Sequence, residues 1–158
     1  MSVMFLAAAL AVSAPPVLTP NATPAPFSQA AQMGDVLYLA GQLGNGPDGK
    51  LAIGMEGQAR QAMDNVKRIV EAHGRTMDDV FKCTVMMGDM KQWGDFNKIY
   101  LTYFKPARLP ARSAFGANGL AGGALLEVEC WAYSPAGPGT PAAPAAPTTD
   151  KQVFPKDE

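Results

Sequence analysis

The sequence predicts an α+β domain in which a β-sheet carries two helices on one face. Five short runs have the character of strands, and two longer runs place apolar residues at helical spacing. The order of these runs is ββ-α-β-α-ββ, which is typical of a sheet with its helices gathered on one side. The 158-residue chain is long enough for one such domain with an extension at each end.

The first two strands are expected at residues 27–33 and 36–43. Gly34-Asp35 lies between them and is a short turn signal that joins two strands as a hairpin. Residues 45–49 read Asn-Gly-Pro-Asp-Gly and predict a loop after the second strand.

A helix follows, with its buried stripe expected at Ala59, Ala62, Met63, Val66, Ile69 and Val70. It should end at Gly74, since glycine readily takes the left-handed conformation that closes a helix. His73 is the only histidine of the chain. It stands just before this glycine, where we expect a structural role at the negative end of the helix.

The second half of the domain begins with a strand at 80–87 and a helix that Pro106 terminates. The strand is expected to carry Phe81, Cys83 and Val85 on one face and Lys82 and Thr84 on the other. The helix stripe consists of Trp93, Phe96, Tyr100, Tyr103 and Phe104.

The last strands are expected at 112–117 and 124–133. In the final strand, alternation directs one set of side chains under the helices, namely Leu126, Val128, Cys130 and Ala132. Glu127, Glu129 and Trp131 then point the other way. A sheet face that carries both charged residues and a large aromatic side chain predicts burial against another subunit, with a polar site in the interface.

Cys83 and Cys130 both lie in predicted strands, where a buried free thiol is the default expectation. A disulfide between them is the alternative if the protein is exported.

The ends of the chain differ in composition from the predicted domain at 26–133. Residues 1–25 begin with a short apolar run that resembles a signal peptide and continue as a Pro/Ala-rich linker. No Lys or Arg precedes Lys50, which argues against a signal peptide, so export and a cytoplasmic location both remain open. Residues 134–158 are rich in Pro, Ala and Thr and are expected to be disordered.

Charge and motif content exclude several classes of function. The net charge of −1 gives no electrostatic case for nucleic-acid binding. There is no Gly-rich phosphate loop and no Cys/His cluster with metal-ligand spacing, so no metal site is expected. The apolar run near the start is too short to span a membrane, and no membrane association of the mature chain is predicted.

The candidate site comes from Pro110-Ala111-Arg112-Ser113-Ala114-Phe115 and the later Leu125-Leu126-Glu127-Val128-Glu129. Arginine can grip a planar carboxylate with two parallel hydrogen bonds. A carboxylate facing it across a small pocket could move protons or orient a water molecule. A structural ion pair between Arg112 and Glu127 on neighbouring strands is the simpler alternative.

These segments resemble the RidA/YjgF family of enamine and imine deaminases. The resemblance covers nearly all of the predicted domain. It is carried by Pro26–Ala30, Leu39–Gln42, Gln58–Val66, Val80–Val85, Phe96–Tyr100, Pro110–Ser113 and Glu127–Glu129. Each segment alone is weak, whereas their order and spacing are specific.

The resemblance implies a chorismate-mutase-like fold, a homotrimer and sites in the clefts between subunits. It also implies hydrolysis of reactive intermediates such as 2-aminoacrylate or 2-iminopropanoate to a 2-oxo acid and ammonia, without a cofactor. Such a protein would limit metabolite damage, and its ligand would be a small 2-imino or 2-oxo acid. The alternative is a non-enzymatic, small-acid-binding or chaperone-like trimer that uses the same cleft.

By the same resemblance, Arg112 corresponds to the carboxylate-binding arginine and Glu127 to the glutamate that orients or activates water. Asn97 corresponds to a polar residue of the cleft, and Gly41 to a backbone contact to the ligand. Three wall positions depart from the family by losing a polar group. Phe27 replaces a common tyrosine, Ala40 a common serine and Ala114 a common cysteine. We therefore expect a more apolar pocket, suited to a bulkier side chain on the imine.

Overall fold

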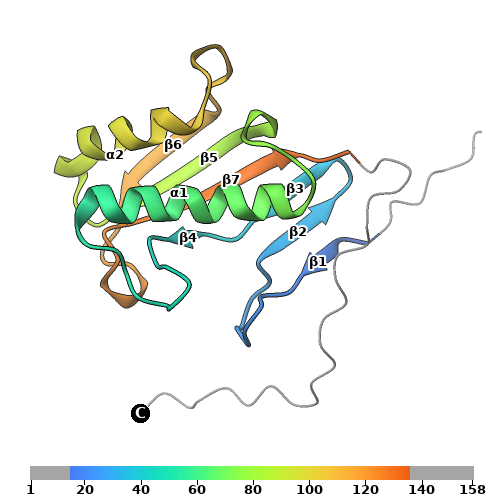
Figure 1. Cartoon of the computed structure of the whole chain (residues 1–158), viewed down its shortest axis with the longest axis horizontal. Helices are drawn as coiled ribbons and strands as arrows, with labels where there is room; N and C mark the ends of the chain where they lie inside the picture. The colour runs from blue at the N-terminus through green and yellow to red at the C-terminus, as the bar shows by residue number, and fades with distance from the viewer. Residues whose placement is uncertain (1–14, 136–158) are drawn as a thin grey trace, which may run out of the picture.

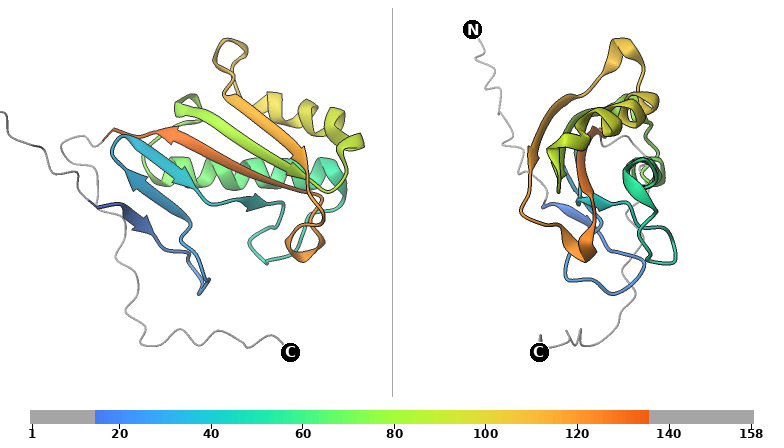
Figure 2. Two further views of the ribbon diagram at one scale, coloured as in Figure 1. Left: turned by 180° about the vertical axis from the view of Figure 1, so that it is seen from behind. Right: turned by 90° about the vertical axis from the view of Figure 1, so that its left-hand side faces the viewer.

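The part of the chain that the structure describes forms a seven-stranded sheet and two α-helices. The edge-on view in Figure 2 shows that the sheet is twisted and that both α-helices lie on the same side of it. The structure is a computed structural model and describes residues 15–135. The α+β class with both helices on one face is confirmed. The strands are β1 (Val17–Thr19), β2 (Ala30–Met33), β3 (Val36–Leu39), β4 (Gln42–Leu43), β5 (Val80–Met87), β6 (Ala111–Gly116) and β7 (Leu126–Tyr133), and the helices are α1 (Gly54–Ala72) and α2 (Trp93–Tyr100).

The strand order is β1-β2-β3-β7-β5-β6, with β4 also paired to β7 (Figure 1). The last strand of the chain therefore lies inside the sheet, and β6 forms one edge. Only β5 and β6 run parallel, and α2 lies between them in the chain. A parallel pair needs a crossover connection of this kind, which places α2 over the β5–β6 end of the sheet.

The core lies between the helices and the sheet, as the apolar spacing predicts. The six expected stripe residues of α1 are fully buried, and so are Leu126, Val128, Cys130 and Ala132 of β7. Gly74 closes α1 with φ +69° and donates its amide hydrogen to the Glu71 carbonyl. None of the described helices is both long and apolar enough to cross a membrane.

Hydrogen bonds of the His73 side chain connect the end of α1 to the first strand. One ring nitrogen lies 2.8 Å from the Ile69 carbonyl oxygen. The other lies 2.8 Å from the hydroxyl of Thr19, a buried residue of β1. His73 therefore has the expected structural role, but one of its two partners is Thr19 of β1, a strand that the composition of this region does not predict.

The presence of β1 shows that part of the predicted linker is wrong. Composition predicts linker through residue 25, yet Val17–Thr19 form β1 and pair with Ala30–Gln32 of β2. The signal-like segment at 1–14 and the tail from 136 onward lie outside the described residues. The strand expected at 36–43 is also divided, because pairing passes from β3 to β4 across Ala40 and Gly41.

Two expectations about the middle strands are wrong. Cys83 and Cys130 are not free thiols, since they are register partners on β5 and β7 and form a disulfide. Phe81 does not share the buried face of Cys83, because a register shift between Val80 and Lys82 turns it outward. Phe81 is 42% exposed, and its ring lies 6.4 Å from that of Trp131 on the open face.

Candidate functional site

Arg112 lies on β6 with its guanidinium against the aromatic residues of α2. Its Cζ atom is 4.5 Å from the ring centroid of Trp93, 4.4 Å from that of Tyr100 and 5.8 Å from that of Phe96. Aromatic faces attract a cation at such distances. Helix α2 therefore fixes where the charge of Arg112 lies, on the helix side of the sheet.

Asn97 belongs to the same group of residues. Trp93, Asn97 and Tyr100 occupy positions i, i+4 and i+7 of the α2 region, so they form one stripe on the helix. Asn97 thus lies between the two aromatic residues that contact the guanidinium. We call Trp93, Phe96, Asn97, Tyr100 and Arg112 the arginine cluster. Ala114 follows Arg112 by two residues on β6, so it points to the same face and extends the wall beside the cluster.

Three polar atoms of the arginine cluster are buried without a hydrogen-bond partner. They are Asn97 Oδ1, the Tyr100 hydroxyl and Arg112 Nη1, and they are the only such side-chain atoms among residues 15–135. Burying a polar group without a partner costs about 1–3 kcal/mol. Such a concentration in one place indicates a site whose partner is a ligand or another chain.

Glu127 lies on the opposite face, above the break between β3 and β4. A Cβ atom at position 41 would be only 1.8 Å from Glu127 Oε1, so the carboxylate occupies the space that glycine leaves. Burial raises the pKa of Glu127 above its ordinary value of 4.5, and the nearby Glu129 carboxylate raises it further. We call Gly41, Glu127 and Glu129 the glutamate cluster.

Register shows why the two clusters are separate within one chain. Arg112 pairs with Cys83 of β5, whose side chain is buried under the helices. Glu127 pairs with Met86, three residues further along the same strand. Side chains alternate along a strand, so an offset of three places Arg112 and Glu127 on opposite faces. The two residues are also not on neighbouring strands, because β5 lies between β6 and β7. The simple ion pair within one chain is therefore wrong.

The remaining expected wall residues are remote from Arg112 in the same chain. Phe27 precedes β2 near the β1 edge of the sheet, the edge opposite to β6, and it is 59% exposed. Ala40 lies at the break after β3, next to Gly41, and donates its amide hydrogen to the Gln29 carbonyl. One chain therefore brings together Arg112, Asn97 and Ala114, and separately Gly41, Ala40 and Glu127.

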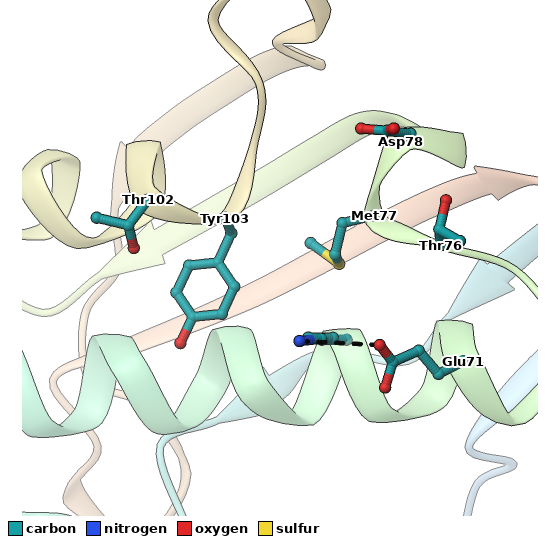
Figure 3. A pocket seen from close by; sticks show the side chains of 7 residues that line it. Glu71, Thr76, Met77, Asp78, Thr102 and Tyr103 are labelled. Atoms are coloured by element: carbon teal, nitrogen blue, oxygen red, sulfur yellow. Dashed lines mark ion pairs between the residues drawn. The ribbon is translucent and has the colours of Figure 1, made fainter.

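A pocket of about 390 Å³ lies elsewhere, between α1 and the segments that carry Met77 and Tyr103 (Figure 3). Its charged groups already have partners, since Lys67 pairs with Glu71 at 3.8 Å and Asp78 pairs with Lys105. The Tyr103 hydroxyl donates a hydrogen bond to Asp64 Oδ1 of α1 at 2.7 Å. None of the expected site residues lines this pocket.

The spacing of apolar residues places Trp93 and Tyr100 in the core stripe and does not predict their contact with Arg112. Both do pack against the core. Asn97 is the signal in the sequence that could have indicated this contact. It is a polar residue on the aromatic, buried stripe of the helix, and a buried polar side chain normally has a hydrogen-bonding partner.

Comparisons with known proteins agree with this fold. Residues 19–134 match the family described as Endoribonuclease L-PSP. A RutC family protein of Pyrococcus horikoshii is 38% identical over 110 residues, which are 68% of this chain and 86% of that protein. The 2-iminobutanoate/2-iminopropanoate deaminase of Mus musculus is 38% identical over 109 residues, 68% of this chain and 80% of that protein.

A solved structure agrees as well. The crystal structure of RidA from a Psychrobacter species is 33% identical and superposes with a TM-score of 0.67, covering 73% of this chain and 93% of that one. The chain therefore belongs to the Endoribonuclease L-PSP family, the RidA/YjgF family of the sequence resemblance.

Proposed function

We propose that this protein hydrolyses reactive 2-imino acids, and the enamines in equilibrium with them, to 2-oxo acids and ammonia. The observation that carries the proposal is the group of three unpartnered polar atoms around the Arg112 guanidinium. A fixed cation with free donors suits a small carboxylate ligand. Relatives named as imine deaminases, such as the mouse protein, support the choice of reaction.

In the proposed mechanism, Arg112 binds the substrate carboxylate and draws electron density from the neighbouring imine carbon. Glu127 orients a water molecule, accepts one of its protons as the oxygen adds to that carbon, and passes this proton to the imine nitrogen, which gives the neutral carbinolamine. The proton of the new hydroxyl then moves through Glu127 to the nitrogen as the C–N bond breaks, so that ammonia leaves and the 2-oxo group forms. No redox step occurs, so positioning and electrostatics can supply the acceleration. The reaction as written needs no cofactor.

This mechanism requires Arg112 and Glu127 from different copies of the chain. The arginine cluster and the glutamate cluster lie on opposite faces of one sheet, so a contact that joins them uses two different surfaces. Such a heterologous contact closes into a ring when the rotation allows. We propose a homotrimer of this kind. The open face, where Trp131 packs edge-on against Tyr38 at 5.0 Å, would lie against the neighbouring subunit.

The pocket wall would favour imines with larger apolar side chains. Phe27, Ala40 and Ala114 add no polar group to it, so an alkyl substituent would not displace a hydrogen bond. Export is proposed as well, since the Cys83–Cys130 disulfide suits an oxidising compartment. We further propose that residues 1–14 act as a signal segment.

The decisive experiment measures ammonia release from imines generated in situ from several amino acids. We expect activity in the wild type and almost none in Arg112→Ala. Arg112→Lys should not restore it, because an ammonium lacks the planar two-pronged grip. Glu127→Gln should retain binding of 2-oxobutanoate while slowing turnover. Equal loss of binding in the Arg112→Ala and Glu127→Gln variants would contradict the separate roles.

The same experiment tests the alternative of a non-enzymatic binding protein, which the loss of polar groups at positions 27, 40 and 114 favours. That protein would bind 2-oxobutanoate through Arg112 without releasing ammonia faster than buffer. Sedimentation completes the test, because a stable monomer at micromolar concentration would exclude a site that two chains share.

A further inference from the structure

The position of the guanidinium between two aromatic rings has a consequence for ligand choice. Trp93 and Tyr100 are seven residues apart, about 10 Å along a helix axis. The Arg112 Cζ atom nevertheless lies within 4.5 Å of both ring centroids. The charge therefore lies between the two rings, and rotation of the guanidinium would have to displace at least one of them.

No carboxylate takes part in holding this arginine within residues 15–135. The ion pairs of that region all involve other cations, namely Lys50, Arg60, Lys67, Lys98 and Lys105. A carboxylate partner would occupy the in-plane N–H groups that a ligand needs. Aromatic rings attract the cation without accepting the paired in-plane hydrogen bonds that a carboxylate accepts, and Arg112 Nη1 has no hydrogen-bond partner among the described residues.

The Tyr100 side chain adds a second feature. Its hydroxyl is buried without a partner, as is Asn97 Oδ1 one helical turn earlier. Burial raises the pKa of Tyr100 to about 12, although the charge of Arg112 acts in the opposite direction. The hydroxyl therefore keeps its proton at physiological pH and remains available as a neutral donor.

We propose that the rings of Trp93 and Tyr100 hold the Arg112 guanidinium for in-plane, two-pronged binding of flat carboxylic acids, with Trp93 as a positioning residue and Tyr100 as a residue that also contacts the ligand. Tetrahedral anions such as phosphate fit that arrangement less well. The inference rests on the proposed function, because it specifies how the same arginine selects its ligand. The Tyr100 hydroxyl donates to the bound acid, and Trp93 acts only through Arg112.

The test compares Trp93→Leu, which removes a ring, with Trp93→Phe, which retains one. In the full-length protein, Trp93→Leu should raise KM and the Kd for 2-oxobutanoate about 3- to 30-fold with little change in kcat. Trp93→Phe should restore most of the loss. The preference for 2-oxobutanoate over inorganic phosphate, measured by calorimetry, should also fall in Trp93→Leu.

Tyr100→Phe isolates the hydroxyl and should weaken 2-oxobutanoate binding while leaving the ring in place. Tyr103→Phe is the matched control, since its hydroxyl bonds to Asp64 away from Arg112 and its loss should not alter Kd. Trp93→Met serves if Trp93→Leu does not fold, because methionine fills similar space without a ring.

Two outcomes separate the inference from the function on which it rests. Should Arg112→Ala bind and hydrolyse like the wild type, the proposed function itself fails. Should Arg112→Ala be inactive while the folded Trp93→Leu or Trp93→Met protein keeps wild-type KM, Kd and anion preference, the positioning role alone is overturned.

Discussion

The carboxylate of Glu127 lies directly over the backbone of Gly41, on the side where any other residue would carry its Cβ atom. The distance of 1.8 Å from that position to Oε1 means that a side chain at position 41 would force the end of the Glu127 side chain to move. The break between β3 and β4 is therefore matched to the glutamate on β7. The family resemblance assigns Gly41 a backbone contact to the ligand, and within one chain its measurable effect is to make space for Glu127.

Gly41→Ala should displace the Glu127 side chain and lower kcat at least as much as Glu127→Gln, while Arg112-dependent binding of 2-oxobutanoate persists. Steady-state kinetics and calorimetry measure the two effects. Gly94→Ala on α2 is the matched control, because a Cβ there meets nothing within 4 Å. Wild-type kcat in a folded Gly41→Ala protein would show that the carboxylate has another productive position.

The raised pKa of Glu127 predicts the acid limb of the pH–rate profile. The proposed mechanism uses the ionised carboxylate, so kcat/KM should fall with decreasing pH around a midpoint above 4.5. Glu129→Gln removes one of the two causes and should move that midpoint to lower pH. An unchanged midpoint would assign the limb to another group.

The same shift affects stability with a defined sign. A carboxyl group whose folded pKa is raised binds its proton more tightly in the folded chain. The stabilisation is present below the unfolded pKa and is lost as pH rises through the folded value. Glu127→Gln should therefore flatten the dependence of unfolding free energy on pH in this window, which urea titrations at several pH values can measure.

The disulfide should contribute substantially to stability. Cys83 and Cys130 are 47 residues apart in sequence, and closing a loop of that size stabilises a fold by about 2–4 kcal/mol. Reduction should lower the thermal midpoint of the wild type, whereas a Cys83→Ala/Cys130→Ala double variant should not respond to reductant. Labelling of both thiols in unreduced, unfolded protein would show that the bond does not form.

Strand β1 should belong to the folding unit. A chain starting at residue 15 should be more stable than one starting at 26, because the shorter chain loses β1 and the Thr19 contact with His73. Thr19→Val should cost about 1 kcal/mol by removing that hydrogen bond. Chemical denaturation measures both effects, and Thr23→Val, at an exposed position, is expected to be neutral.

The sequence alone was sufficient for the parts of the fold that depend on local periodicity. The α1 stripe, the Gly74 terminus, the Gly34 turn and the alternation along β7 all follow from side-chain spacing of 3.6 or 2 residues or from the turn chemistry of glycine. The short strand β1 was missed because three residues in a Pro/Ala/Thr-rich stretch carry no period. Its strand character comes from pairing with β2 and from His73, both remote in sequence.

Only the tertiary structure decided which candidate site residues share a face. The sequence pattern predicts Arg112 and Glu127 on two late strands. Whether the two side chains share a face depends on the strand order, in which β5 lies between β6 and β7, and on the offset of three residues between their partners on β5. Strand order and register are set by contacts between segments remote in sequence, so the pattern within either strand does not predict them. The aromatic contacts of Arg112 are likewise decided by the crossover of α2. The sequence identified Arg112, Asn97 and Glu127 as candidate site residues, and long-range pairing determined that one chain holds Arg112 and Glu127 apart on opposite faces of the sheet.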